Sequence, residues 1–145
     1  MKFLSTGNEI YKIKLETYGY DWCGSNYGPR IEIQSGNGAT RRTYWQAPFS
    51  KGTTLEWSNR NGKLGGVSGF QVTPYVDKYF ALTHYYINIR IIAGGKDQFC
   101  PRNIYVYTYG GTIYEYSFGS PRSPEWVGKG QGEGKRRALK MGNLK

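Results

Sequence analysis

Histidine, cysteine and long apolar runs are scarce in this sequence of 145 residues. One histidine, His84, and two cysteines are present, and the cysteines do not form a Cys-x-x-Cys pair. A structural zinc site needs about four such ligands, so the sequence gives no support for one. Acid–base catalysis at neutral pH usually recruits histidine, and we expect His84 to be an ordinary surface residue on a strand. We therefore predict that the chain is not an enzyme.

Signals for targeting and membrane insertion are also missing. The first residues, MKFLSTGNEIY, contain an apolar core of only Phe3 and Leu4, far short of a secretory leader. No run approaches the roughly 20 apolar residues that span a bilayer as a helix. The two cysteines, Cys23 and Cys100, either form one disulfide or stay reduced. A disulfide would indicate an extracellular protein; otherwise the localisation is unknown.

Tyrosine and glycine, in contrast, are abundant, with 14 and 21 residues. Aromatic and β-branched residues between frequent glycines favour strands and tight turns, and no segment shows helical apolar spacing. Alternating apolar residues predict strands over 11–16, 30–34, 40–45, 53–57, 67–73, 84–92 and, as a pair, within 104–118. In the first of these, Tyr11, Ile13 and Leu15 share one face. About eight strands at regular spacing predict an all-β fold, an antiparallel β-sandwich.

The stretch IYVYTYGGTIYEYSF, residues 104–118, predicts a β-hairpin that carries a ladder of tyrosines. Gly110-Gly111 is a typical two-residue loop, and counting outward from it pairs Tyr107 with Tyr114 and Tyr105 with Tyr116. These four side chains then share one face, and either face can be the buried one. We favour the outward orientation because the aliphatic face matches the other strands. The tyrosines Tyr105, Tyr107, Tyr114 and Tyr116 are then a docking surface.

The net charge of +10 is unevenly distributed, because residues 127–145 hold six basic residues and one acid. We expect a β-sandwich domain over residues 1–126 and a Gly-rich basic tail over 127–145 that forms an irregular arm. Such an arm either keeps the protein soluble or binds acidic protein surfaces or nucleic acid. The candidate contact residues in it are Lys135, Arg136, Arg137 and Lys140.

Large aromatic residues outside the hairpin are further candidates for binding. The loop after the first strand contains Tyr18, Tyr20, Trp22 and Tyr27. A basic and aromatic group, Arg41, Arg42 and Trp45, follows; such groups stack on bases or sugars and anchor protein interfaces. Burial in the core is the alternative, which we expect for Trp57 and Trp126.

Metal binding has one weak candidate pair, Asp21 and Asp97, in loops that a disulfide would bring together. Two carboxylates with carbonyl oxygens can hold Ca²⁺, but aspartate is common in turns for conformational reasons. We therefore expect no metal and no cofactor.

Three segments resemble a known family, the PLAT/LH2 β-sandwich found in lipoxygenases and lipases. YKIKLETYGYDWCGSNYGPRIEIQS is similar to the opening strand, loop and second strand of that family. FSKGTTLEW and GKLGGVSGFQV are similar to its middle strands, and DQFCPRNIYVYT with IYEYSF and Trp126 to its closing run. Gln98-Phe99 stands where the family usually has tryptophan. The resemblance covers about residues 10–126 and implies a non-catalytic module that docks onto protein or lipid, sometimes with Ca²⁺.

Taken together, these features predict a non-catalytic structural or interaction subunit of a larger assembly. It would dock by its aromatic sheet surface and its basic arm onto other protein subunits, with nucleic acid as a second candidate partner. The alternative is a PLAT-like accessory module that binds lipid or protein at a membrane or extracellular surface, and only this alternative involves Ca²⁺.

Overall fold

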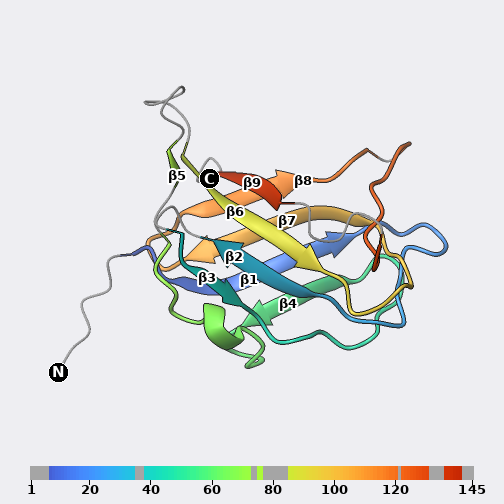
Figure 1. Ribbon diagram of the computed structural model, residues 1–145, viewed down its shortest axis with the longest axis horizontal. Coiled ribbons are helices and arrows are strands. Elements are labelled where there is room, and N and C mark those ends of the chain that lie inside the picture. Colours follow the sequence, from blue (N-terminus) through green and yellow to red (C-terminus); the bar gives the residue numbers. More distant parts are fainter. Residues whose placement is uncertain are drawn as a thin grey trace.

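The computed structural model confirms the all-β fold and consists of strands joined by loops and one turn of 3-10 helix (Figure 1). It describes residues 7–34, 38–72, 75–76, 85–120, 122–130 and 136–141, with the backbone alone at 75–76, 85–86 and 136–141. The elements are β1 (Ile10–Thr17), β2 (Arg30–Gln34), β3 (Thr40–Arg42), β4 (Thr54–Ser58), η1 (Gly65–Val67), β5 (Tyr75–Val76), β6 (Tyr85–Ile92), β7 (Pro101–Thr108), β8 (Ile113–Ser117) and β9 (Arg136–Met141).

The strands form an antiparallel sandwich. The hydrogen-bonded order is β3-β2-β6-β9-β8-β7-β1-β4, and the short β5 pairs with β6. In Figure 1, β2 and β6 cross in front of β1 and β7, so the order folds into two layers that stay joined where β9 pairs with both β6 and β8. Strands β3 and β4 are the two ends of this order.

The core lies between the layers and is built by strand alternation. Ile31 and Ile33 of β2 and Ile89 of β6 are fully buried from one layer, as are Ile13 and Leu15 of β1 from the other. The two largest fully buried side chains are aromatic. As expected, Trp57 is one of them, and its indole N–H donates to the carbonyl of Tyr44 at 2.9 Å.

The predicted β7–β8 hairpin exists, but its register is shifted by one residue. Val106 pairs with Tyr114 and Tyr107 with Ile113, because the loop has three residues, Tyr109 to Gly111, rather than two. The amide of Thr108 donates to the carbonyl of Thr112 at 3.0 Å, and the third loop position, Gly111, has φ +90°. Three-residue hairpin loops commonly place a left-handed residue there.

A one-residue shift turns the side chains of one strand to the other face of the sheet. The prediction that Tyr105, Tyr107, Tyr114 and Tyr116 share a face is therefore wrong. Tyr114 belongs to the core and is 3% exposed, and the partly buried Tyr116 packs against the same core cluster. Tyr105 and Tyr107 lie half-buried on the outer face, where their neighbours on β8 are Glu115 and Ile113.

The first strand also differs in one detail. A register irregularity between Ile10 and Lys12 places Ile10 in the core and leaves Tyr11 half-buried outside it. Such β-bulges insert one residue into a strand. Tyr11 therefore does not share the inward face of Ile13 and Leu15, as simple alternation predicted.

Two further expectations about local structure need correction. Residues 67–72 form no strand; η1 ends at Val67, and Gln71 makes a single bridge to Glu9. The C-terminal segment is not irregular at 136–141, because these residues form β9 between β6 and β8. The division of the chain into a domain over residues 1–126 and a tail over 127–145 stays a prediction, although β9 of that tail pairs with two strands of the sandwich.

Candidate functional site: the loop end of the sandwich

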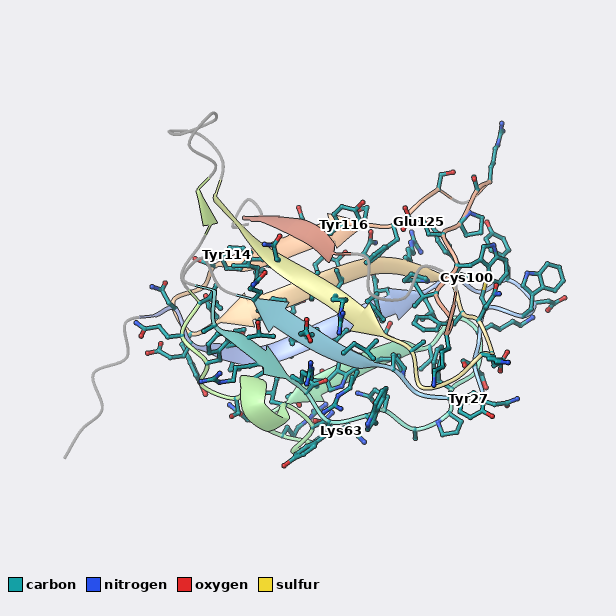
Figure 2. All side chains as sticks on the ribbon, viewed as in Figure 1. Tyr27, Lys63, Cys100, Tyr114, Tyr116 and Glu125 are labelled. Atoms are coloured by element: carbon teal, nitrogen blue, oxygen red, sulfur yellow. A yellow bond between two sulfur atoms is a disulfide. The ribbon has the colours of Figure 1, made fainter. Side chains whose placement is uncertain are left out.

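Four loops meet at one end of the sandwich, which we call the loop end. They are residues 18–29 between β1 and β2, 43–53 between β3 and β4, 93–100 between β6 and β7, and 118–130 after β8. The strand directions require this, since β1, β6 and β8 end where β2, β4 and β7 begin. In Figure 2, the labelled Tyr27, Cys100 and Glu125 all lie at this end, on the right.

A disulfide and backbone bridges hold these loops together. Cys23 and Cys100 are bonded and fully buried, with Trp126 packed against them. Ser25 and Phe49 exchange two backbone hydrogen bonds of 3.0 Å. The disulfide resolves the alternative that the sequence left open, and it is compatible with an extracellular location.

The first loop is also fixed by close packing at a glycine. A Cβ atom on Gly28 would lie 1.7 Å from the carbonyl oxygen of Gln46, so the loops 18–29 and 43–53 touch through their backbones. The amide of Gln46 donates to the carbonyl of Pro29 at 2.9 Å, and the amide of Asn26 donates to the carboxylate of Asp97 at 2.7 Å. These contacts fix the loops of the loop end to one another, and we call the result a braced surface.

Trp22 projects from this braced surface. Its side chain is 73% exposed, and its φ of +60° is the one left-handed value among the described non-glycine residues. A bulky residue in this conformation is rare and costs about 1–3 kcal/mol. A hydrogen bond of 3.2 Å from the amide of Cys23 to the carbonyl of Tyr20 closes a turn that contains Trp22. The disulfide fixes the next residue, Cys23, so the turn holds Trp22 in this conformation.

Two other exposed aromatic side chains belong to the same loop as Trp22. Tyr20 is 44% exposed and Tyr27 51%, whereas Tyr18 is buried and stacks on Tyr20 with ring centroids 5.7 Å apart. A hollow of about 400 Å³ opens beside Trp22 and is lined by Tyr20, Asp21, Trp22, Cys23, Pro124 and Trp126. Exposed rings on braced loops form a ready contact surface for an apolar or interfacial partner.

The charges at the loop end are mostly positive. The carboxylate of Asp21 pairs with the ammonium of Lys51, and this hydrogen bond and charge hold the pKa of Asp21 below its ordinary value. Exposed cations from three other segments lie on the same end: Lys96, Arg102, Arg122 and Lys129. The guanidinium of Arg102 lies 5.8 Å from the ring centroid of Tyr18.

The described residues do not fit a Ca²⁺ site at this end. No three acidic, histidine or cysteine side chains group together in the part of the chain that the structure describes. The two carboxylates considered from the sequence are engaged elsewhere, Asp21 by Lys51 and Asp97 by the amide of Asn26. We derive no step through a metal.

The residues predicted as binding sites are distributed over several surfaces. Arg41, Arg42 and Trp45 are exposed. The Nε of Arg42 lies 2.9 Å from the carboxylate of the buried Glu32, and the guanidinium carbon of Arg30 lies 4.7 Å from the ring centroid of Trp45. Lys135 and His84 fall outside the described residues, and Arg136, Arg137 and Lys140 lie in β9 with side chains that are not described. The binding roles of these residues stay predictions.

The sequence pointed to the aromatic loop but not to the whole loop end. It identified Tyr18, Tyr20, Trp22 and Tyr27 as candidates because four large aromatics stand in one glycine-rich loop, and of these Tyr18 is buried. It missed Lys51, Lys96 and Lys129, which lie on three separate loops of the same end. No local pattern marks these lysines.

Comparison with known proteins supports the fold. No family model matches the sequence, and no curated protein is similar to it in sequence. Among solved structures, a lipoxygenase deletion variant matches over 92% of this chain with TM-score 0.55 and 18% identity. Coral 8R-lipoxygenase, described as activated by calcium through a C2-like domain, matches over 92% with TM-score 0.50 and 17% identity. The chain thus resembles the PLAT/C2-like β-sandwich, as the sequence predicted.

The similarity covers a small part of those proteins. The chain spans 16% of the first lipoxygenase and 17% of the coral enzyme. At this identity the match concerns the fold alone. Within the described residues, no helix has the length and apolar character needed to cross a bilayer.

Proposed function

We propose that this chain is a non-catalytic accessory module that docks with its loop end into the interfacial region of a lipid membrane. The observation that carries the proposal is Trp22, held 73% exposed and in a left-handed conformation at the tip of a disulfide-braced loop. Tryptophan favours the membrane interface, where its ring is partly buried and its N–H stays hydrated.

The area available on Trp22 is large enough to matter. A tryptophan buries up to about 250 Å², so the exposed fraction corresponds to roughly 180 Å² and about 4.5 kcal/mol at full burial. The rigid loop reduces the entropy lost on docking. Trp22 with Tyr20 and Tyr27 therefore supplies a contact of useful strength without any rearrangement of the fold.

The cations of the loop end add a second, salt-sensitive contribution to the free energy of membrane binding. Lys96, Arg122 and Lys129 are exposed on two other loops of the same end, and each basic residue near an anionic bilayer contributes about 1 kcal/mol. The acid nearest to the tip, Asp21, is paired with Lys51 and so repels anionic headgroups little. We infer a preference for membranes that contain anionic lipid.

The resemblance to one part of lipoxygenases supports this proposal. In those proteins the matching region is about a sixth of the chain, which is consistent with an accessory role for the present fold. Assembly with other protein subunits, with nucleic acid or through the C-terminal segment stays a prediction from the sequence.

Co-sedimentation with vesicles tests the proposal. Vesicles of phosphatidylcholine with roughly 30% phosphatidylserine, an anionic lipid, should bind the wild-type protein. Trp22→Ala should weaken binding at least roughly tenfold, since it removes more than 1.4 kcal/mol of burial. Tyr109→Ala, which removes an aromatic side chain that is 56% exposed at the opposite end, is the matched control and should bind normally.

Three results would count against the proposal. The wild-type protein failing to sediment with either neutral or anionic vesicles would refute it. Equal vesicle binding by the wild-type protein and by Trp22→Ala would show that another surface docks onto the membrane. Binding abolished by a calcium chelator would show that a metal is required, contrary to the contacts of Asp21 and Asp97.

A further inference from the structure

A second surface with its own chemistry lies on the outer face of the layer β4-β1-β7-β8. Four tyrosine rings form a continuous row on it: Tyr105, Tyr107, Tyr11 and Tyr109. The centroid distances along the row are 6.4, 6.2 and 5.0 Å. We call this row the tyrosine row. Tyr105 and Tyr107 face outward by simple alternation with the buried Ile104 and Val106, and Tyr11 joins them because of the bulge in β1.

A polar groove lies beside the tyrosine row, over the outer face of the paired strands β1 and β4. Its volume is about 490 Å³, and it is lined by Tyr11, Lys12, Lys14, Glu56, Ser58, Asn59 and Arg60. The groove and the row are continuous, because Tyr11 belongs to both and the ammonium of Lys12 lies 4.4 Å from the ring centroid of Tyr107.

The acids of this face already have partners within it. Glu16 accepts hydrogen bonds from the amide of Asn103 at 2.8 Å and from the hydroxyl of Tyr105 at 3.2 Å. Glu56 accepts from the hydroxyl of Ser58 at 3.0 Å and pairs with Arg60 at 3.4 Å.

The lysines of the groove are not paired in the same way. Within the described part of the chain, neither Lys12 nor Lys14 forms an ion pair, although Lys14 stands opposite Glu56 in the register. Two residues apart on one strand, they lie roughly 7 Å from each other along the groove. The groove therefore presents two ammonium groups that an anionic ligand can neutralise.

We propose that this face binds an acidic saccharide chain. The C–H faces of sugar rings pack on tyrosine rings, Asn59, Ser58 and Glu56 can exchange hydrogen bonds with hydroxyl groups, and Lys12 and Lys14 bind the carboxylate or sulfate groups.

Single-stranded nucleic acid also combines rings with phosphates, but one observation favours the saccharide. The buried Cys23–Cys100 disulfide is typical of oxidising compartments, where glycans are abundant and nucleic acids are not.

Isothermal titration with two matched ligands tests the proposal. A galacturonate hexamer should bind saturably to the full chain, and its methyl ester, which has the same rings without charge, should bind at least fivefold more weakly. The double variant Lys12→Gln/Lys14→Gln should lose roughly tenfold in affinity for the hexamer, as expected for two exposed charge contacts. Tyr107→Leu should weaken the binding of both ligands.

The matched control is Lys96→Gln/Lys129→Gln, which removes the same charge at the loop end and should bind the hexamer as the wild type does. Near-ultraviolet circular dichroism establishes that each variant is folded. The absence of hexamer binding, equal loss in the control, or tighter binding of a thymidine 12-mer than of the hexamer would each overturn the proposal. Vesicle docking should be unchanged in Tyr107→Leu, so this proposal and the membrane proposal fail independently.

Discussion

Removal of the Cys23–Cys100 disulfide should strongly destabilise the fold. The bond joins residues 77 positions apart, and chain-entropy arguments assign a loop of this length about 4.5 kcal/mol of stabilisation at 25 °C. For a domain of this size that corresponds to a fall in Tm of roughly 15 °C. The double variant Cys23→Ala/Cys100→Ala, unfolded in guanidinium chloride, measures the difference directly.

A second state of the wild-type protein separates the crosslink from packing. Both sulfur atoms are fully buried, so the alanine variant also leaves a small void, whereas the reduced wild-type protein keeps the sulfur atoms and loses only the bond. We expect the reduced protein to lose most of the same stability. If reduction and the double substitution each cost less than about 1 kcal/mol, the bond does not constrain the unfolded chain in the way that this reasoning requires.

Four other predictions concern the sheet. Tyr114→Ala should cost about 3 kcal/mol in urea unfolding and Tyr105→Ala about 1 kcal/mol, since only Tyr114 fills the core; equal costs would contradict the observed register. Burial raises the pKa of the Tyr114 hydroxyl, so the unfolded chain ionises first and stability should fall as pH rises above about 10, less steeply in Tyr114→Phe. Glu32→Gln should cost about 2 kcal/mol, because the buried carboxylate pairs with Arg42 and Arg90; an unchanged midpoint would refute this. Deleting residues 127–145 should unfold the protein, because β9 joins β6 to β8, and a folded truncated chain by circular dichroism would show that β9 is dispensable.

The fold class follows from the sequence because strand alternation and turn residues are local signals. Ile13, Leu15, Ile31 and Ile89 were identifiable as core residues from spacing alone, and they are fully buried. The strand over 136–141 was not identifiable, because it lies in a glycine-rich basic segment and is defined by its pairing with β6 and β8. Pairing between distant strands leaves little trace in a single sequence.

The tyrosine surface shows how one residue of loop length changes a functional interpretation. A two-residue loop at Gly110-Gly111 would align four tyrosines, whereas the observed three-residue loop divides them between core and surface. The sequence alone permits both loops, and the choice depends on packing of Tyr114 against the core. The outer tyrosine row is completed instead by Tyr11, whose position depends on a bulge.

The position of Trp22 in a bilayer tests the account most directly. Vesicles with acyl chains brominated near the glycerol should quench the tryptophan fluorescence of the wild-type protein, and the quenching should be lost in Trp22→Phe while vesicle binding is partly retained. Trp57 is fully buried and should contribute nothing to it. Quenching of equal size in the wild-type protein and in Trp22→Phe would contradict docking through the loop end.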